Sequence, residues 1–433
     1  MNKSVWVDEV NLKRFKSLDG DLKTDVLIIG GGMAGVLCAY MLHNKGIDYA
    51  LVEKDKIAMG ITKNTTAKIT SLHGLIYSKL VCDWGKEQAQ MYLTKNEEAV
   101  RKYKQMCASI DCHFEERDAY TYSIRDRKII EREVMTVNDL GFKGEFCQKT
   151  ELPFEVKGAI KFKNQGQFNP LEFIGRIAEN LNIYEDTFVY KIENGVALTN
   201  KGKIYAEKII VSTHFPFWNM HGSYFLKLYQ HRSYVTAFEN VIKPQGMYVD
   251  ADQKGMSFRG YKNMLLIGGG GHRTGKMGGN WDEIERFAKE HYPTARIKYR
   301  WATQDCMSLD SIPYIGKYSK RTGDVFVATG FNKWGMTGSL VASEVLSDLV
   351  LGKENEYVKL FSPSRKMLKM QLLANGFEAT TNLMTPKVRR CPHLGCALNW
   401  NKAEHSWDCP CHGSRFDDEG RLIDNPAQKN ADV

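Results

Sequence analysis

The sequence has no long uninterrupted apolar segment. Its longest apolar stretch, residues 26–42, contains four glycines and is accounted for by the strand and helix described below, so we expect no transmembrane span. Residues 1–20 carry charges throughout and have no apolar centre, which argues against a signal peptide. A membrane-spanning or secreted protein is therefore not expected.

A strong excess of charge of one sign is also absent. Sixty Lys and Arg residues accompany 51 Asp and Glu residues, which gives a net charge of +9 over 433 residues. Because the basic side chains are interspersed with acids, we expect dispersed solvating charge and no nucleic-acid partner. No internal repeat is evident. With 43% hydrophobic residues the chain can bury substantial cores, and its length predicts two or three domains.

One glycine-rich segment has the order of elements found in dinucleotide sites. Residues 26–29 are wholly apolar and predict a buried parallel strand. Residues 37–44 predict the following helix, and a second predicted strand, residues 49–52, is followed by Glu53. Between the first strand and the helix lie three glycines in the spacing G-x-G-x-x-G: Gly30, Gly32 and Gly35.

Each part of this segment has a physical role in binding a dinucleotide. Gly30 allows a tight turn, Gly32 lets the backbone approach a pyrophosphate, and Gly35 lets helix and strand pack closely. The helix N-terminus offers N–H groups to the phosphates, and Glu53 can accept hydrogen bonds from a ribose. The order of the elements argues against a glycine-rich loop without a ligand. The motif alone does not decide between NAD and FAD.

Helix-like and strand-like segments follow along the rest of the chain. Helices are predicted at residues 87–106, 171–182, 282–291 and 338–351. Strands are predicted at residues 114–125, 141–154, 183–192, 206–213, 229–238, 247–261, 264–268 and 324–330. The β-like runs between residues 229 and 268 predict a mixed or antiparallel sheet.

The ten cysteines fall into two groups. Six are scattered, as in a protein of the reducing cytosol, and predict a cytoplasmic location: Cys38, Cys82, Cys107, Cys112, Cys147 and Cys306. Four lie within the last 43 residues, together with His393 and His412: Cys391, Cys396, Cys409 and Cys411. That density predicts a metal site or a disulfide.

From about residue 20 to residue 360 the chain resembles the D-amino-acid-oxidase-like flavoproteins, which include glycine oxidase and sarcosine oxidase. Four segments carry the resemblance in the expected order: residues 30–53, 187–192, 301–316 and 328–339. The resemblance implies an FAD enzyme, with Val189 beside the adenine and residues 330–337 around the flavin ring. It adds four residues to the predicted cofactor site: Gly330, Gly335, Met336 and Thr337.

The predicted helix after this loop would support a flavin. Its start near Gly338 would direct N–H groups and a positive dipole end toward the pyrimidine edge of the reduced ring. An ordinary strand-to-helix turn is the alternative for this segment.

Two positions depart from the family pattern. Glycine oxidases have W-A-G-L-R-P-x-T-x-D-G-x-P-x-I-G, in which an arginine binds the substrate carboxylate, whereas this chain has Asp305 at that place. A carboxylate there would repel an acid and favour a cationic amine, unless Asp305 is a structural acid held by hydrogen bonds. The cysteine that attaches the flavin in sarcosine oxidases aligns with Thr303 and not with Cys306, so we expect noncovalent FAD.

The predicted catalytic residues are Asp305, His272 and Arg259. Arg259, His272 and Arg273 are candidates to face the flavin from the β-rich region, with surface charge as the alternative for each. In this family the flavin takes a hydride from the carbon next to nitrogen and does not require a strong protein base.

The carboxyl-terminal segment resembles the ligand pattern of Rieske iron–sulfur proteins. Residues 391–396 read C-P-H-L-G-C and residues 409–414 read C-P-C-H-G-S. In a Rieske [2Fe–2S] centre two thiolates hold one iron and two imidazoles hold the other. The resemblance implies that Cys391 and Cys409 bind the first iron, and that His393 and His412 bind the second. Zinc bound by the same residues is the alternative.

Further residues of this segment can be compared with positions of Rieske proteins. Cys396 and Cys411 match the pair that forms a disulfide between the two ligand loops in respiratory Rieske proteins. Ser414 matches a hydroxyl that raises the cluster potential, whereas Phe416 replaces a tyrosine donor. We therefore expect a potential between those of plant-type ferredoxins and respiratory Rieske centres. The segment is short for a Rieske domain, so we expect it to pack against the flavoprotein.

We thus expect an α/β protein with a Rossmann-like FAD-binding domain, an inserted mixed β-sheet substrate domain and a small all-β Rieske unit. The predicted FAD-binding domain combines residues 1–95, 145–225 and 305–360. The predicted substrate domain combines 96–144 and 226–304, followed by a linker at 361–386 and the Rieske unit at 387–433.

The leading hypothesis is an FAD-dependent oxidoreductase that oxidises an amine or related C–N substrate. Electrons would then pass singly through the [2Fe–2S] centre to a one-electron acceptor protein or another acceptor. One alternative is an electron-transfer relay or redox sensor without a dedicated substrate. The other is an oxidase that uses O2 and in which the cluster is structural.

The substitution Phe416→Tyr is expected to raise the potential of the cluster. The added hydroxyl restores a hydrogen-bond donor near the cluster, which favours the reduced, more negative state. Redox titration of both proteins tests this, and an unchanged potential would reject the assumed role of the position.

Overall fold

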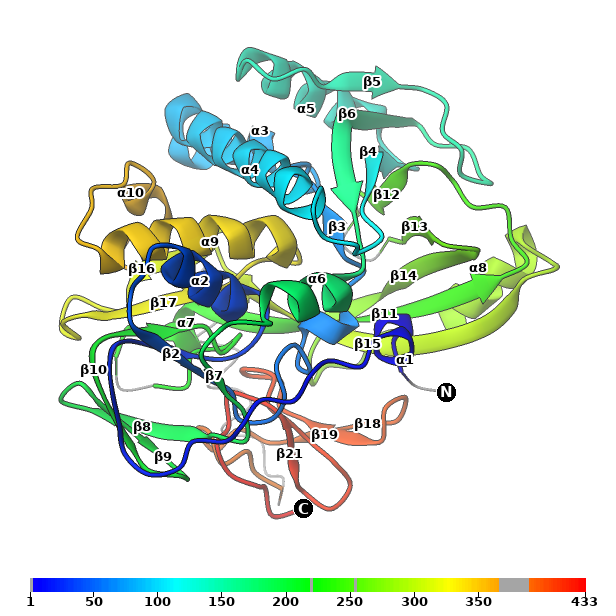
Figure 1. Cartoon of the computed structure of the whole chain (residues 1–433). Helices are drawn as coiled ribbons and strands as arrows, with labels where there is room; N and C mark the ends of the chain where they lie inside the picture. The colour runs from blue at the N-terminus through cyan, green and yellow to red at the C-terminus, as the bar shows by residue number, and fades with distance from the viewer. Residues whose placement is uncertain (1–2, 219–220, 253–254, 366–388) are drawn as a thin grey trace.

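The computed structural model describes residues 3–218, 221–252, 255–365 and 389–433. Within these ranges the strands form three sheets, and helices pack against the two large ones (Figure 1). The architecture is the expected α/β fold with a small all-β unit at its carboxyl end. No helix in these ranges combines the length and the apolar composition that a bilayer span requires.

The glycine-rich loop belongs to a mainly parallel sheet. The order of its strands is β16 (Tyr314–Lys317), β17 (Val325–Thr329), β10 (Lys203–Val211), β1 (Leu22–Ile29), β2 (Tyr49–Val52) and β7 (Ile183–Tyr184). A hairpin of β8 (Val189–Glu193) and β9 (Val196–Thr199) continues from β10. Because β1 has parallel neighbours on both sides, its apolar residues are buried. The helices α2 (Met33–Asn44) and α9 (Gly335–Val350) pack together on this sheet.

The second sheet is mixed, as the β-like runs predict. Its order is β15 (Arg296–Ser308), β11 (Leu228–Glu239), β14 (Met264–Arg273), β13 (Ser257–Tyr261), β12 (Met247–Asp250), β4 (Glu115–Ser123), β6 (Gly158–Gln167) and β3 (Lys68–Ile69). The short β5 (Glu145–Cys147) pairs with β6. The β4–β12 pair is parallel and the other printed pairs of this sheet are antiparallel.

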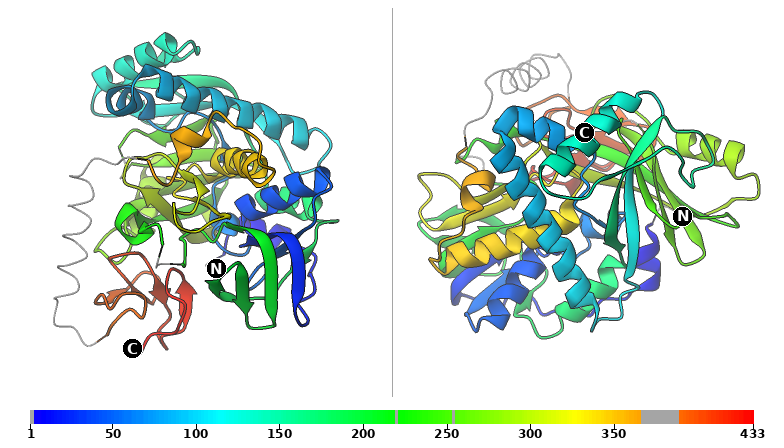
Figure 2. Two further views of the ribbon diagram at one scale, coloured as in Figure 1. Left: turned by 90° about the vertical axis from the view of Figure 1, so that its left-hand side faces the viewer. Right: turned by 90° about the horizontal axis from the view of Figure 1, so that it is seen from above.

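The third sheet forms the carboxyl-terminal unit. Its strands are β18 (Asn399–Asn401), β19 (Ser406–Asp408), β20 (Arg415–Phe416) and β21 (Leu422–Asp424). Figure 2 shows this unit, in red, at one side of the larger body. Side-chain hydrogen bonds such as Arg232 to Glu404 connect the two, so the short unit packs against the flavoprotein as expected.

The remaining helices lie between the strands or at the surface. They are α1 (Val5–Glu9), η1 (Thr62–Asn64), α3 (Ile76–Trp84), α4 (Lys86–Cys107), α5 (Arg127–Asp139), α6 (Pro170–Ile177), α7 (Tyr224–Lys227), α8 (Asp282–His291) and α10 (Val358–Phe361).

Several local predictions from the sequence differ from the structure. The predicted strand at 247–261 is two strands, β12 and β13, and within 141–154 only β5 is a strand. Helix α5 was not foreseen, although Asp126 caps its start and Ile130 and Val137 provide a buried helical face. The segment 183–192 is two strands, since the chain turns at Asp186, which has φ +51°. Helix α9 begins at Gly335, three residues before the predicted start.

Adding a methyl group at Gly35 is expected to destabilise the fold. A Cβ at this position would lie 1.9 Å from the Gly30 carbonyl oxygen and 2.8 Å from Ser212 Oγ. Such overpacking costs about 1–3 kcal/mol, so Gly35→Ala should lower the free energy of unfolding in urea by that amount. Gly60→Ala is the control, because a Cβ there meets nothing within 4 Å. Equal stability of the two variants would contradict the close helix–strand contact.

Flavin cavity and iron–sulfur centre

A cavity of about 1220 Å3 extends from the glycine-rich loop to the second sheet and the carboxyl-terminal unit. Its walls include the loop at 30–34, the segment 52–66, parts of β11 and β15, and the loop at 331–336. Residues 422–425 of the carboxyl-terminal unit complete the wall. The cavity is therefore bounded by all three sheets.

The glycine loop has the close packing that its spacing predicts. Gly30 has φ +108°, and a Cβ there would lie 2.7 Å from the Ser212 carbonyl oxygen. At Gly32 a Cβ would meet only Thr62 Oγ1, at 3.6 Å, and this glycine lines the cavity. Gly32 is thus the position at which the backbone is open to a ligand, as a pyrophosphate requires.

Glu53 lies at the same end of the cavity in a fixed orientation. Its carboxylate accepts hydrogen bonds from the backbone N–H of Gly31 (2.7 Å) and of Asp55 (3.1 Å). Burial raises the pKa of Glu53, and these N–H groups oppose the shift. Val189, at the start of β8, also lines the cavity. These residues fit the adenosine part of FAD.

The loop before α9 is held rigidly at the opposite end. Asn332 and Lys333 have positive φ angles of +51° and +72°. The Asn332 amide donates to Ser308 Oγ (2.9 Å) and to the Gly330 carbonyl (2.7 Å). Gly335 and Met336 line the cavity, so the start of α9 faces it.

The other two residues predicted in this loop lie behind the cavity wall. Gly330 directly follows β17 and has φ +71°. Thr337 is buried, and its hydroxyl lies 3.0 Å from His73 Nε2. His73 in turn stacks on Trp334, with ring centroids 4.8 Å apart. Both predicted residues therefore support the loop.

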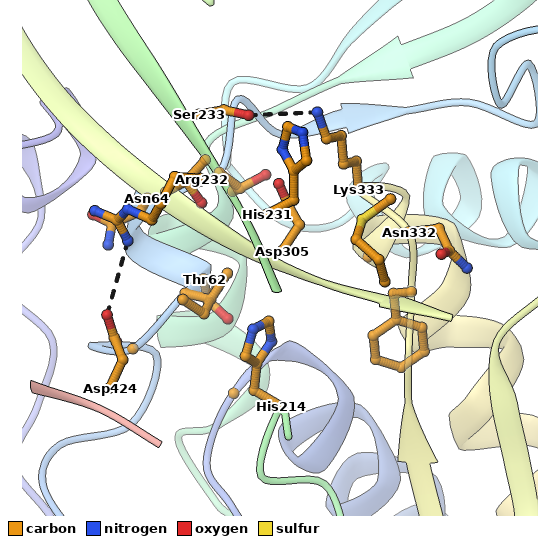
Figure 3. A pocket seen from close by; sticks show the side chains of 18 of the residues that line it. Thr62, Asn64, His214, His231, Arg232, Ser233, Asp305, Asn332, Lys333 and Asp424 are labelled. Atoms are coloured by element: carbon orange, nitrogen blue, oxygen red, sulfur yellow. Dashed lines mark hydrogen bonds and ion pairs between the residues drawn. The ribbon is translucent and has the colours of Figure 1, made fainter. Parts of the chain in front are cut away.

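Three ionisable side chains meet near this loop: Asp305, His231 and Lys333 (Figure 3). His231 and Asp305 are register partners on β11 and β15. Burial raises the pKa of Asp305, while Lys333 and Arg232 oppose the shift. Burial lowers the pKa of Lys333, and Asp305 opposes that shift. Asp305 and Lys333 thus place an acidic and a basic side chain on the wall of one cavity, and burial disfavours the charged form of each.

His231 is a neutral polar group in this cluster. Burial, with Lys333 and His272 nearby, lowers its pKa to about 3. Its Nδ1 is buried and has no hydrogen-bond partner among the residues that the structure describes. His231 and Lys333 were not predicted from the sequence. The sequence did contain a signal for His231: it lies in a polar run, residues 230–233, within a strand whose remaining residues are mostly apolar.

The structure does not bring all predicted catalytic residues to the cavity. Asp305 lines it, whereas His272 and Arg259 are not among the described residues of its wall. The Arg259 guanidinium is fully buried and donates to the carbonyls of Thr66 (2.5 Å) and Ala67 (2.9 Å). His272 Nδ1 lies 3.1 Å from the Gly270 carbonyl.

Thr303, which aligns with the flavin-attaching cysteine of sarcosine oxidases, is also part of the cavity wall. Cys306 is buried outside the cavity, with Sγ 3.5 Å from Thr329 Oγ1. Cys306 is thus not placed to attach a flavin. Arg273, the remaining candidate from the sequence, contacts the carboxyl-terminal unit.

The four predicted cluster ligands lie together in the carboxyl-terminal unit. The Cys391 and Cys409 thiols are within hydrogen-bond distance, and the His393 and His412 rings are 4.9 Å apart and nearly perpendicular. Both nitrogens of His393 and Nδ1 of His412 are buried, and none of the three has a hydrogen-bond partner in the described part of the chain. Buried polar atoms normally have partners, so these nitrogens fit metal ligands.

Hydrogen bonds and burial shift the pKa values of these ligands: the hydrogen bond with Cys391 and burial raise that of Cys409 well above its ordinary value, whereas those of the other three are lowered. Burial lowers the pKa of His393 to about 4 and, with His393 and Arg273 nearby, that of His412 to about 3. Both imidazoles are therefore neutral, as metal binding requires. The hydrogen bond from Cys409, together with the N–H groups of His393 and Leu394 and the Ser414 hydroxyl, outweighs burial and lowers the pKa of Cys391 to about 7.

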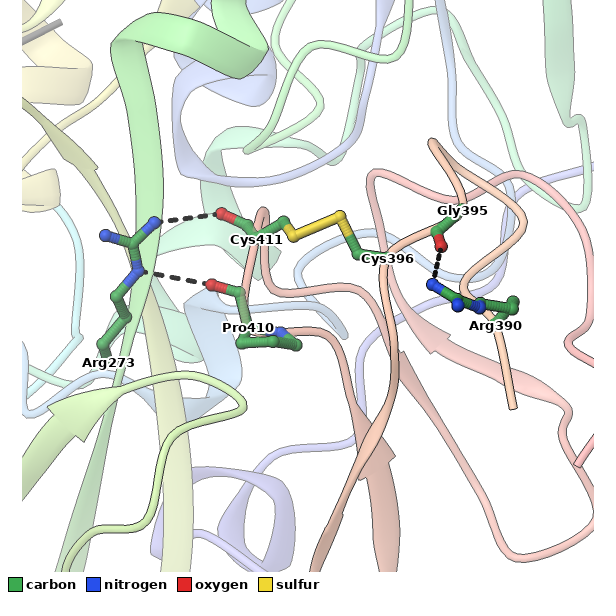
Figure 4. The surroundings of a disulfide bond; sticks show 6 residues. All are labelled: Arg273, Arg390, Gly395, Cys396, Pro410 and Cys411. Carbon is green, nitrogen blue, oxygen red and sulfur yellow. Dashed lines mark hydrogen bonds between the residues drawn. A yellow bond between two sulfur atoms is a disulfide. The ribbon is translucent and has the colours of Figure 1, made fainter. Parts of the chain in front are cut away.

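The two ligand loops are joined by the predicted disulfide between Cys396 and Cys411 (Figure 4). The sulfur atoms of Cys396, Cys409 and Cys411 lie within 4.8 Å of one another. Two of these sulfurs are joined covalently and cannot be thiolate ligands. Of the three, only Cys409 is therefore available as a thiolate ligand.

Comparison with known proteins agrees with this geometry. Residues 25–349 match the FAD dependent oxidoreductase family, and residues 387–433 match the Rieske [2Fe-2S] domain. YhfW of Bacillus subtilis strain 168, named for a Rieske 2Fe-2S centre, is 33% identical, and the alignment covers 98% of this chain and 96% of YhfW.

Solved structures share the fold of the larger body. L-proline dehydrogenase from P. horikoshii has a TM-score of 0.66 and 19% identity, and the match covers 80% of this chain and 98% of that chain. Glycine oxidase from Geobacillus kaustophilus has a TM-score of 0.64 and 19% identity, and the match covers 80% of this chain and all of that chain. FAD and a [2Fe–2S] cluster are thus the cofactors, and the chain belongs to the FAD-dependent oxidoreductase family, with a Rieske domain at its carboxyl end.

Proposed function

We propose that the protein oxidises a small amine or related C–N substrate at noncovalent FAD and passes the electrons singly through the [2Fe–2S] centre to an acceptor. The observation that carries the proposal is the shared cavity. Its wall runs from the glycine loop past Asp305 to Asp424 and Asn425 of the Rieske domain. Substrate site and cluster-binding domain thus adjoin one flavin site.

The chain's own residues hold and orient FAD. The open backbone at Gly32 and the N-terminus of α2 bind the pyrophosphate, and Glu53 accepts the ribose hydroxyls. The N-terminus of α9, at Gly335, stabilises negative charge on the pyrimidine edge. When bound, FAD supplies the hydride acceptor for oxidation of a carbon next to nitrogen.

Substrate recognition rests on the opposite charges near the ring end. The Asp305 carboxylate holds the substrate ammonium, as the replacement of the family's arginine by an acid predicts. Lys333, fixed beside Ser233 at 3.4 Å, offers a positive partner for a second, anionic group on the substrate. The neutral His231, the register partner of Asp305, adds a further hydrogen-bonding nitrogen. We infer that a primary or secondary amine, with or without a carboxylate, is the substrate.

The Rieske domain allows the electrons to leave the flavin one at a time. A flavin accepts two electrons as a hydride, whereas the cluster carries one at a time. An enzyme that removes two electrons from its substrate can therefore reduce a one-electron acceptor protein.

Anaerobic mixing with a panel of amines and amino acids tests the proposal. We expect loss of flavin absorbance, followed by the EPR signal of the reduced Rieske cluster. A protein that contains zinc without iron, or a flavin that no member of the panel reduces, would contradict it. Peroxide formation that does not depend on the cluster would favour an O2-using oxidase.

Removal of the Asp305 charge should weaken turnover of cationic substrates. Loss of a charged hydrogen bond of about 1.5–3 kcal/mol lowers kcat/KM roughly 10-fold to 100-fold in Asp305→Asn. Asp250→Asn is the matched control, because Asp250 lines the same cavity and its pKa is also raised by burial. An equal effect of both variants would reject a specific role for Asp305.

The pH profile gives an independent test of the same residue. Because burial raises the pKa of Asp305, its charged form is lost at a higher pH than for an ordinary aspartate, whose pKa is about 3.9. We expect kcat/KM for an amine to fall as the pH falls through this raised value. This acidic fall of kcat/KM should be absent in Asp305→Asn. If it persists in that variant, another titrating group causes it.

A further inference from the structure

A chain of hydrogen bonds connects the flavin cavity with a cluster ligand. His214 lines the cavity, and its Nε2 donates to Gln230 Oε1 at 3.1 Å. The Gln230 amide donates to the backbone carbonyl of His412 at 2.9 Å and to that of Asn425 at 2.9 Å. One side chain, Gln230, thus spans the distance between a cavity-lining residue and the backbone of a cluster ligand.

A second buried amide fixes the orientation of the first. Gln304 Nε2 donates to Gln230 Oε1 (2.7 Å) and to the Gly413 carbonyl (2.9 Å). Thr274 Oγ1 donates to Gln304 Oε1 at 3.0 Å. Gln230 and Gln304 are 1% and 0% exposed. Because each amide has partners on both its oxygen and its nitrogen, neither can rotate without loss of hydrogen bonds.

The flavoprotein packs tightly against the ligand loop around Gln230. A Cβ on Gly413 would lie 2.5 Å from Gln230 Cβ, and one on Gly275 would lie 2.4 Å from Pro410 N. Phe215 and Phe225 lie 6.2 Å and 6.1 Å from the His412 ring, measured between centroids. His412 is only 2% exposed. The ligand loop is therefore enclosed by the flavoprotein on this side.

Attachment of the Rieske domain does not depend on Gln230 alone. Arg232 forms an ion pair with Glu404, and Arg273 donates to the carbonyls of Pro410 (3.3 Å) and Cys411 (3.2 Å; Figure 4). The Asn425 amide donates to the carbonyls of Thr213 and Phe215. Burying a polar amide costs free energy that an apolar side chain would avoid. A role beyond attachment accounts for the placement of Gln230.

We propose that the path His214–Gln230–His412 carries electrons from the flavin to the cluster, with Gln230 as its positioning residue. This inference rests on the proposed function. In each transfer the reduced flavin loses one electron and the oxidised cluster gains one, so no bond to Gln230 forms or breaks. The second electron follows after an external one-electron oxidant has reoxidised the cluster.

The test compares two buried glutamines in the full-length protein with both cofactors. A light pulse with EDTA as electron donor reduces the bound FAD without a substrate, and cluster reduction is followed by EPR on rapidly frozen samples. Changes around metal ligands typically cost about 10-fold to 100-fold in activity, and we expect a slowing of that size in Gln230→Met. Gln304→Met is the comparison, since it loses the bonds to the Gly413 carbonyl and to Gln230 Oε1 but keeps the bonds of Gln230 to His214 and to the His412 carbonyl, so we expect a smaller slowing there.

Two further measurements separate the path from a structural effect. His214→Phe, which breaks the path at the cavity and removes no hydrogen bond to the Rieske domain, should slow cluster reduction as well. Redox titration of FAD and cluster in each variant shows whether the driving force has changed. Unchanged rates in Gln230→Met and His214→Phe, or equal slowing in Gln304→Met, would overturn the path.

The wild-type protein distinguishes this failure from that of the proposed function. If the wild-type cluster is not reduced after its flavin, electron transfer between the two is itself rejected. If the wild-type cluster is reduced and the variants match its rate, the transfer stands and only the path through Gln230 is rejected.

Discussion

A buried group of charges between the Rieske domain and the second sheet determines the relation of the two redox sites. Arg415 donates to Asp408 (2.9 Å), Glu404 (2.9 Å) and Asp424 (3.1 Å), and Arg232 of β11 shares Glu404. Although burial opposes it, these carboxylates hold the pKa of Arg415 above its ordinary value. Buried charges are tolerated only when they are paired and hydrogen-bonded, so the Rieske domain has one well-defined position against β11.

The same group of charges also shapes the cavity. Arg232, Glu404, Arg415 and Asp424 all line it, and Arg232 contributes to the electrostatic environment of Asp305. Attachment of the Rieske domain and the charge balance of the substrate site are therefore physically linked. This linkage explains why a polar, ion-paired contact occurs where an apolar interface would suffice for packing.

Local patterns predicted some elements closely and others poorly. The predicted strand at 49–52 and helix at 282–291 agree with β2 and α8, because their periodicity and end residues lie within the segments themselves. The break at Asp186 depends on distant residues instead. The adjacent Glu185 is buried, and its carboxylate accepts N–H bonds from Phe15 (3.0 Å) and Ile57 (2.8 Å), which no local pattern reveals.

The sequence by itself predicted FAD and a [2Fe–2S] cluster through short motifs and the families that they resemble, because the glycine loop and the cluster ligands lie in local patterns whose spacing suits the group they bind. Tertiary structure decided how these parts meet. Gln230 and His412 are 182 residues apart in sequence, and His73 and Thr337 are 264 apart. The meeting of Asp305, His231 and Lys333 likewise follows from the pairing of β11 with β15 and the turn before α9. Such contacts depend on strand pairing and packing between segments far apart in the chain, which a linear pattern does not encode.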